Sequence, residues 1–166
     1  MRKKTEFRMD ASKSTKLLTV LALFILTAFG VYCVMSGVRE TVIFLVLALA
    51  VFLLYLMMPV SLTLEDCVVI VKRVAGKTTL NVSEVEEVRI LEELGRGLLF
   101  GSAGLFGWYG VFVVEGETAL VYSRKEKNLV LVKVRGRNYV FGIDDRQAFI
   151  SGLETCGSQK VKSPEL

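Results

Sequence analysis

The sequence predicts a transmembrane α-helical hairpin followed by a small, mainly-β domain of about seven strands with a C-terminal capping helix. Three observations predict this fold class. Two long runs without charge, residues 17–38 and 41–64, lie near the N-terminus. Short β-branched runs separated by turn residues follow them, and helical spacing returns only after residue 144. We expect four segments: a basic cytoplasmic tail (1–16), the helical hairpin (17–60), the β domain (61–156) and a flexible polar tail (157–166).

The two uncharged runs have the length of membrane spans. A helix needs roughly 20 apolar residues to cross a hydrocarbon core about 30 Å thick. The second run is apolar on every face, without the single apolar stripe of a helix at the surface of a soluble protein. Pro59 is expected to mark its end, because proline lacks the donor that would continue the helix. One alternative is that both runs form a buried hairpin of a soluble protein. Another is that the first run is a cleaved signal peptide, but no A-x-A cleavage site follows it.

The charges predict the orientation of the hairpin and exclude a nucleic-acid partner. Residues 1–16 hold six cations and two anions, a net charge of 6 − 2 = +4, and Arg39 is the one cation in the short connection. Cations favour the cytoplasmic side, so both the N-terminus and the C-terminal domain are expected in the cytoplasm of a multi-pass protein of the cell membrane. Residues 61–166 carry 14 cations and 14 anions, so the domain lacks the basic surface that phosphate binding requires.

The β domain is predicted from period-two alternation and turn residues. A helix is expected after residue 144, because Asp144 and Asp145 resemble an N-terminal cap and Phe149, Ile150 and Leu153 share one face. The strands should form a bent sheet or a partly open barrel that this helix caps. The candidate strands are residues 61–64, 68–74, 78–81, 88–91, 109–115, 119–123, 129–134 and 139–142.

The predicted domain carries a set of residues known from one group of domains: Arg96, the segment GSAGLFGWYG at 101–110, Tyr122, NLVLV at 128–132, Tyr139, Val140, Asp144, Asp145, Phe149 and Ile150. With these residues, the order of elements resembles the bacterial pleckstrin-homology (PH)-like domains of membrane proteins, here behind two N-terminal transmembrane helices. The resemblance covers residues 61–156 and implies the fold and the position behind membrane helices, without one agreed activity. Eukaryotic PH domains read phosphoinositides with basic residues around the first hairpin loop; here that loop is acidic, which makes this mode of binding doubtful.

A glycine-rich segment, residues 95–110, is expected to be a loop. It lacks the GxxxxGK[ST] pattern of a phosphate-binding loop, and a phenylalanine interrupts its start of a GxGxxG. Phe100, Leu105, Phe106 and Trp108 would contact the bilayer surface or a partner protein if they are exposed. The alternative is that they fill the core, with the glycines allowing tight turns.

A second candidate surface is basic. Strand alternation would put Lys133, Arg135 and Arg137 on one face, where a membrane-tethered domain could rest on anionic lipid, at about 1 kcal/mol for each close cation. An ordinary solvated face is the alternative.

No catalytic chemistry, cofactor or metal is expected. The chain has no histidine, and Cys33, Cys67 and Cys156 show no CxxC spacing and no evident pairing. The sequence therefore predicts an interaction or scaffold module, not an enzyme, that binds a protein partner, a second copy or the membrane surface. The alternative is a small accessory or regulatory subunit of a transport or envelope complex that acts through its helices.

Overall fold

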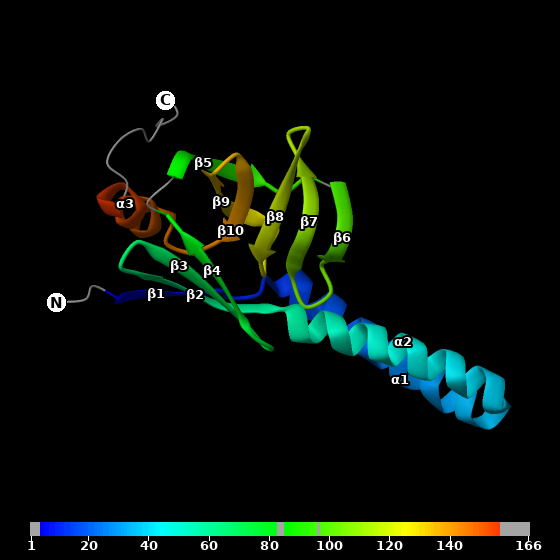
Figure 1. Cartoon of the computed structure of the whole chain (residues 1–166). Helices are drawn as coiled ribbons and strands as arrows, with labels where there is room; N and C mark the ends of the chain where they lie inside the picture. Colours follow the sequence, from blue (N-terminus) through cyan, green and yellow to red (C-terminus); the bar gives the residue numbers. More distant parts are fainter. Residues whose placement is uncertain (1–3, 83–84, 96, 157–166) are drawn as a thin grey trace.

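The computed structural model describes residues 4–82, 85–95 and 97–156, which form three helices and ten strands (Figure 1). The predicted polar tail, residues 157–166, and Arg96 lie outside the described residues. In chain order the elements are β1 (Lys4–Arg8), α1 (Lys13–Ser36), α2 (Val38–Met57), β2 (Pro59–Glu65), β3 (Val68–Arg73), β4 (Lys77–Asn81), β5 (Val85–Glu93), β6 (Gly97–Ala103), β7 (Trp108–Val114), β8 (Glu117–Ser123), β9 (Lys127–Val134), β10 (Arg137–Gly142) and α3 (Arg146–Cys156).

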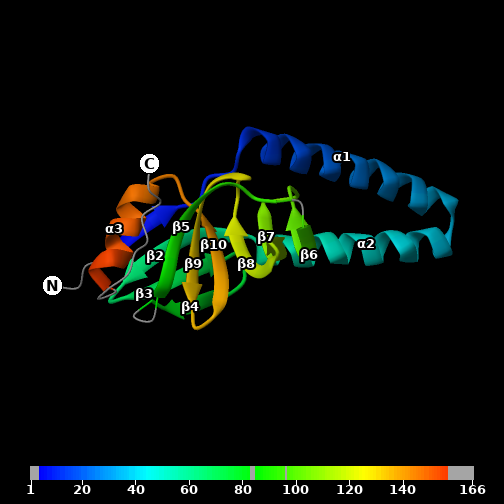
Figure 2. The ribbon, with the colours of Figure 1, turned by 90° about the horizontal axis from the view of Figure 1, so that it is seen from above.

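The predicted helical hairpin is confirmed. Helix α1 begins at Lys13, where the Ser12 hydroxyl accepts a hydrogen bond from the Thr15 amide at 3.1 Å and caps the helix. Gly37, with φ +139°, joins the two helices. Helix α2 ends at Met57, and only Met58 separates it from β2, which begins at Pro59. Both helices are long and apolar enough to cross a membrane, and they project together from the β domain (Figures 1 and 2).

The predicted mainly-β domain with a C-terminal helix is confirmed, and its strands form two sheets. The first has the order β1-β2-β3-β4 and the second the order β5-β9-β10-β8-β7-β6. Neighbouring strands are antiparallel except for β8 and β10, which pair in parallel. The two sheets face each other across a common core, and α3 lies at the end of the domain opposite the helical hairpin (Figures 1 and 2).

The N-terminal segment is part of the domain, which corrects the expectation of a tail over residues 1–16. Strand β1 pairs with β2 along its whole length, from Lys4 opposite Glu65 to Arg8 opposite Ser61. Phe7 and Met9 are buried in the common core. The helical hairpin is therefore an insertion between two paired strands. Three of the five residues of β1 are charged and only Phe7 is a large apolar residue, so the composition of this segment resembles that of a polar tail.

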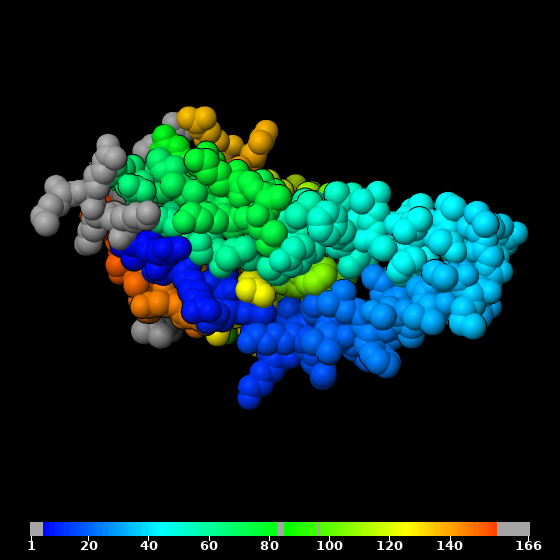
Figure 3. Space-filling view, turned by 90° about the horizontal axis from the view of Figure 1, so that it is seen from below, coloured from blue at the N-terminus to red at the C-terminus, as the bar shows by residue number. Residues whose placement is uncertain are grey.

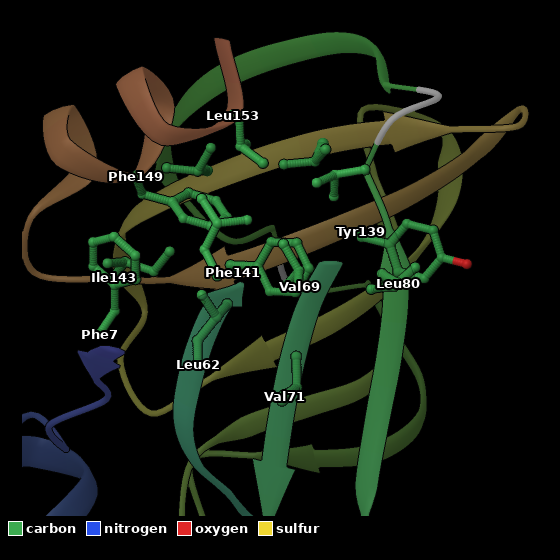
Figure 4. Packing of buried hydrophobic residues seen from close by; sticks show 14 of the residues in the cluster. Phe7, Leu62, Val69, Val71, Leu80, Tyr139, Phe141, Ile143, Phe149 and Leu153 are labelled. Carbon is green, nitrogen blue, oxygen red and sulfur yellow. The ribbon is translucent and has the colours of Figure 1, made fainter. Parts of the chain in front are cut away.

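Helix α3 closes one end of the core, as the sequence predicts. Phe149 is fully buried and meets the Phe7 ring edge-on with centroids 5.4 Å apart. It also meets Phe141 of β10 with centroids 5.9 Å apart. Figure 4 shows Phe149 and Leu153 pointing from α3 into side chains of both sheets. Burial of these large apolar side chains is the main driving force for closing the domain.

The glycine-rich segment is a β-hairpin, so the expectation of a loop over residues 95–110 is wrong. Strand β6 pairs with β7, and Gly101 lies opposite Gly110 in that pair. Both have positive φ, +124° and +119°, and a Cβ on Gly101 would lie 2.1 Å from the Tyr109 carbonyl oxygen. Only glycine permits this approach. Strand β6 also lacks period-two alternation, because Leu99 is the extra residue of a bulge between Leu98 and Phe100.

One cysteine forms a disulfide that the sequence does not predict. Cys67, at the turn between β2 and β3, is disulfide-bonded, whereas no pairing is expected from spacing. Cys33 is a free, buried thiol in α1.

Candidate functional site: the junction of the helices and the β domain

The β6–β7 turn, residues 104–107, lies between the two long helices where they leave the domain. The Phe106 amide donates a hydrogen bond to the Thr19 hydroxyl of α1 at 3.0 Å. On the other side, the Phe106 ring meets the Tyr55 ring of α2 edge-on, with centroids 5.5 Å apart. Figure 3 shows yellow-green atoms from this part of the chain between α1 in blue and α2 in cyan. The turn therefore contacts both helices at once.

The turn is shaped by its own hydrogen bonds. The Gly104 amide donates to the Gly107 carbonyl at 2.9 Å, and the Ser102 hydroxyl donates to the Leu105 carbonyl at 2.5 Å. A Cβ at Gly104 would lie 2.7 Å from the Leu18 side chain, and its φ of +107° also favours glycine. The absence of a side chain lets the turn approach α1 closely.

The domain also caps the C-terminal end of α2. The last four carbonyls of a helix have no partner within the helix. Here the Tyr109 hydroxyl donates to the Leu54 carbonyl at 2.7 Å, and the Ala75 amide of the β3–β4 turn donates to the Leu56 carbonyl at 2.9 Å. The Met58 amide donates to the Tyr55 carbonyl at 3.1 Å. Three of the four carbonyls are thus satisfied, two of them by the β domain.

The environment of Tyr109 keeps its hydroxyl protonated. The side chain is 1% exposed, and burial raises its pKa to about 12, opposed by a weaker interaction with Ser102. A neutral phenol can donate to a carbonyl, whereas a phenolate cannot. The Tyr109–Leu54 hydrogen bond is therefore maintained at all physiological pH values.

The structure separates the four apolar residues proposed as an interaction loop. Phe106 faces the chain's own helices, and Trp108 lies at the start of β7 with its ring 6.3 Å from that of Phe112. Leu105 is half-buried, whereas Phe100 on β6 is 66% exposed. Phe100 is thus the member of this set whose side chain remains open to an external contact.

A groove of about 350 Å³ lies beside the turn. Its walls come from the first turns of α1, the β6–β7 turn and Trp108, and they are mainly apolar. Leu17, Leu18 and Leu21 supply the α1 wall. The groove lies where the uncharged part of α1 begins.

The three basic residues of the other candidate surface do not share one face. Arg135 and Gly136, with φ +49° and +69°, form the β9–β10 turn, so Arg137 lies on the next strand. Lys133 is opposite Asn138 and near Glu117, with Nζ and Oε2 3.8 Å apart, whereas Arg137 is opposite Val134. Residues paired in this way share a face, so Lys133 and Arg137 project to opposite sides of the hairpin.

Arg135 and Arg137 line a second, polar groove of about 430 Å³ between the β9–β10 turn and β4. Thr79 and Asn81 lie on its opposite wall. Figures 1 and 3 show the β9–β10 hairpin projecting from the side of the domain and not along the helices. The groove is therefore set apart from the junction.

The described residues contain no group of three or more Cys, Asp or Glu side chains that could hold a metal ion. The β2–β3 turn carries Asp66 and follows Glu65, so the first hairpin loop of the domain is acidic. It lacks the cationic side chains that would bind a phosphorylated headgroup.

Sequence reasoning missed Thr19, Tyr109 and the carbonyl of Leu54. One signal for Tyr109 is present: a buried tyrosine usually finds a hydrogen-bond partner, and Tyr109 lies in an apolar strand between glycine and Trp108. No pattern in the sequence identifies the partner, because it is a backbone carbonyl 55 residues away.

Comparison with known proteins agrees with this architecture. A family model described as bacterial PH domain matches residues 60–156, from β2 to the end of α3. No curated protein and no solved structure matches the chain. The predicted resemblance is confirmed, and the helical hairpin and β1 lie outside the matched region. The chain belongs to the bacterial PH domain family.

Proposed function

We propose that the chain is a membrane-anchored interaction module without catalytic activity, in which the helical hairpin spans the bilayer and the PH-like domain binds a protein partner. The observation that carries this proposal is the junction. Contacts of Phe106 and Tyr109 with α1 and α2 hold the domain against the ends of both helices. A domain attached by a flexible linker could rotate freely, whereas this one presents a constant face to its surroundings.

The pairing of β1 with β2 supports an even number of crossings. Both strands belong to one sheet, and α1 and α2 lie between them in the chain. The two helices therefore either both cross the membrane or both remain outside it. The cations before α1 favour a cytoplasmic domain. The disulfide at Cys67 favours the opposite side, because disulfides persist mainly in oxidising compartments.

Thiol labelling in intact cells tests the orientation. Glu154→Cys places an exposed thiol on α3, and Arg39→Cys places one at the opposite end of the hairpin. Both variants also carry serine at positions 67 and 156, so that these native cysteines do not react, and Cys33 is buried. We expect a membrane-impermeant reagent to label position 39 in intact cells and position 154 only after permeabilisation. The reverse pattern would place the domain outside and agree with the disulfide.

The polar groove beside the β9–β10 turn is the proposed partner site. It presents the Arg137 guanidinium beside the Thr79 hydroxyl, which suits an acidic segment of a partner protein. Its lateral position favours a partner beside the domain over lipid below it.

Photo-crosslinking in native membranes tests this function. A photoreactive residue at position 137 should give specific adducts that persist when α1 and α2 are replaced by unrelated apolar helices of equal length. The matched control carries the photoreactive residue at Ser151, on the exposed side of α3. Adducts that disappear with the native helices would contradict the proposal.

Such a loss would support the second candidate function, an accessory subunit that acts through its helices. Most of the surface of α1 and α2 is exposed, and a groove of about 470 Å³ runs beside Gly30 and Phe44. In a membrane this surface meets either lipid or another helix.

A further inference from the structure

We propose that strand β6 is a second membrane contact: its apolar outer edge lies along the bilayer interface beside the two helices. This inference rests on the proposed membrane crossing of α1 and α2. It adds a surface of the β domain to the membrane contact made by the two helices. That surface lies on β6, in the segment for which the sequence predicts a loop.

The exposed apolar side chains of the domain gather at one end. Outside α1 and α2, the large apolar side chains that are exposed among the described residues are Val60, Val74, Leu98, Leu99 and Phe100. Val60 follows the end of α2 closely, and the Val74 amide donates to the Met58 carbonyl at 3.0 Å. The other three are consecutive residues of β6, which Figure 1 shows beside the domain-proximal end of α2.

The lengths of α1 and α2 determine how close the β6 end of the domain lies to the bilayer. The uncharged part of α2, residues 41–57, is about 25 Å long at 1.5 Å per residue, which is shorter than a hydrocarbon core of about 30 Å. The bilayer boundary on the domain side therefore reaches the end of α2. On α1 the uncharged part starts after Lys16, so the same boundary lies near Leu17.

The β6–β7 turn already lies at that depth. Phe106 contacts Thr19 and Tyr55, both of which are inside the uncharged parts of their helices. Strand β6 leads directly into this turn and runs across the direction of the helices, not along it (Figure 1). Its residues therefore remain near the boundary and do not recede from the membrane.

The chemistry of β6 suits the interface. The strand is the last in its sheet, pairs with β7 on one side and carries no charge, in the sequence GLLFGSA. Soluble proteins usually protect such an edge with charged residues. Water and lipid headgroups can satisfy the unpaired backbone groups, which the hydrocarbon core cannot. The bulge at Leu99 leaves Leu99 and Phe100 61% and 66% exposed, and both can reach the acyl boundary.

Tryptophan quenching in lipid nanodiscs tests this inference on the full-length chain. Trp108 is the single tryptophan, so Trp108→Phe provides a dark background. Phe100→Trp reports on β6, Phe52→Trp reports on an exposed position within the uncharged part of α2, and Glu154→Trp on α3 is the aqueous control. Each variant is compared in phosphatidylcholine with and without brominated acyl chains, after far-UV circular dichroism has confirmed its fold.

We expect brominated lipid to reduce the emission at positions 100 and 52 and to leave position 154 unchanged. Emission at position 100 that is blue-shifted but unquenched would mean that a second copy or another protein covers β6. Red-shifted, unquenched emission would mean that water covers it. Either result at position 100, with position 52 quenched, overturns the inference. Loss of quenching at position 52 would instead contradict the membrane crossing on which the proposed function depends.

Discussion

The hydroxyl of Tyr109 is the group whose removal tests the junction most directly. Tyr109→Phe retains the ring and its packing and removes only the donor to the Leu54 carbonyl, 2.7 Å away. The carbonyl then loses its partner at a part-buried helix end. Leaving a buried acceptor unsatisfied costs about 1–3 kcal/mol. The opening of the junction should therefore become roughly 5- to 150-fold more frequent, at about 1.4 kcal/mol per factor of ten.

Hydrogen–deuterium exchange of the full chain in nanodiscs measures this opening. The informative amides are those of Phe106 and Ala75, which donate to the Thr19 hydroxyl and the Leu56 carbonyl across the junction. Local opening without global unfolding exposes amides in this way. Both should exchange faster in Tyr109→Phe, while amides of β9 and β10 in the core should be unaffected.

Tyr139→Phe is the matched control. It makes the same chemical change on β10, where Figure 4 shows the hydroxyl directed out of the core cluster. If Tyr109→Phe changes exchange at the junction no more than Tyr139→Phe does, the hydroxyl does not couple the domain to α2. The account of a fixed domain orientation would then be wrong.

Three further predictions concern single positions. Gly101→Ala should lower the melting temperature of the domain more than Gly116→Ala. Both glycines have positive φ, but the new Cβ at position 101 would lie 2.1 Å from the Tyr109 carbonyl oxygen, whereas a Cβ at position 116 would have no neighbour within 4 Å; equal losses would exclude the close approach as the cause. Tyr109 should ionise last in an absorbance titration of the tyrosines. Its pKa is raised to about 12 in the folded state, so the contribution of the protonated Tyr109 to the free energy of unfolding is complete below pH 10 and is lost as the pH rises through 12. A titration curve that Tyr109→Phe leaves unchanged would contradict this. Gly30→Ala should weaken the helical hairpin in thermal unfolding, since the new Cβ would lie 2.7 Å from the Phe44 ring, and Phe44→Leu should restore it; failure of that rescue would argue against this contact.

The helices and most strands follow from local pattern. Uncharged runs of more than 20 residues and the proline at position 59 predict α1 and α2, because the membrane-like composition and the missing donor act within each segment. Alternation predicts eight of the ten strands, and the spacing of Phe149, Ile150 and Leu153 predicts α3. The two strands that alternation does not predict, β1 and β6, are a charged segment and a bulged glycine-rich segment.

The junction and the two surfaces were decided by the tertiary structure. Local pattern records whether a residue faces apolar or polar surroundings, not which distant segment supplies them. The sequence by itself therefore determines a hairpin of two apolar helices, each long enough to cross a membrane, and a PH-like β domain. Only the fold inserts the hairpin between β1 and β2, places Phe106 between the helices and directs Tyr109 to Leu54. It also turns Lys133 and Arg137 to opposite faces, because a two-residue turn interrupts the strand that would have aligned them.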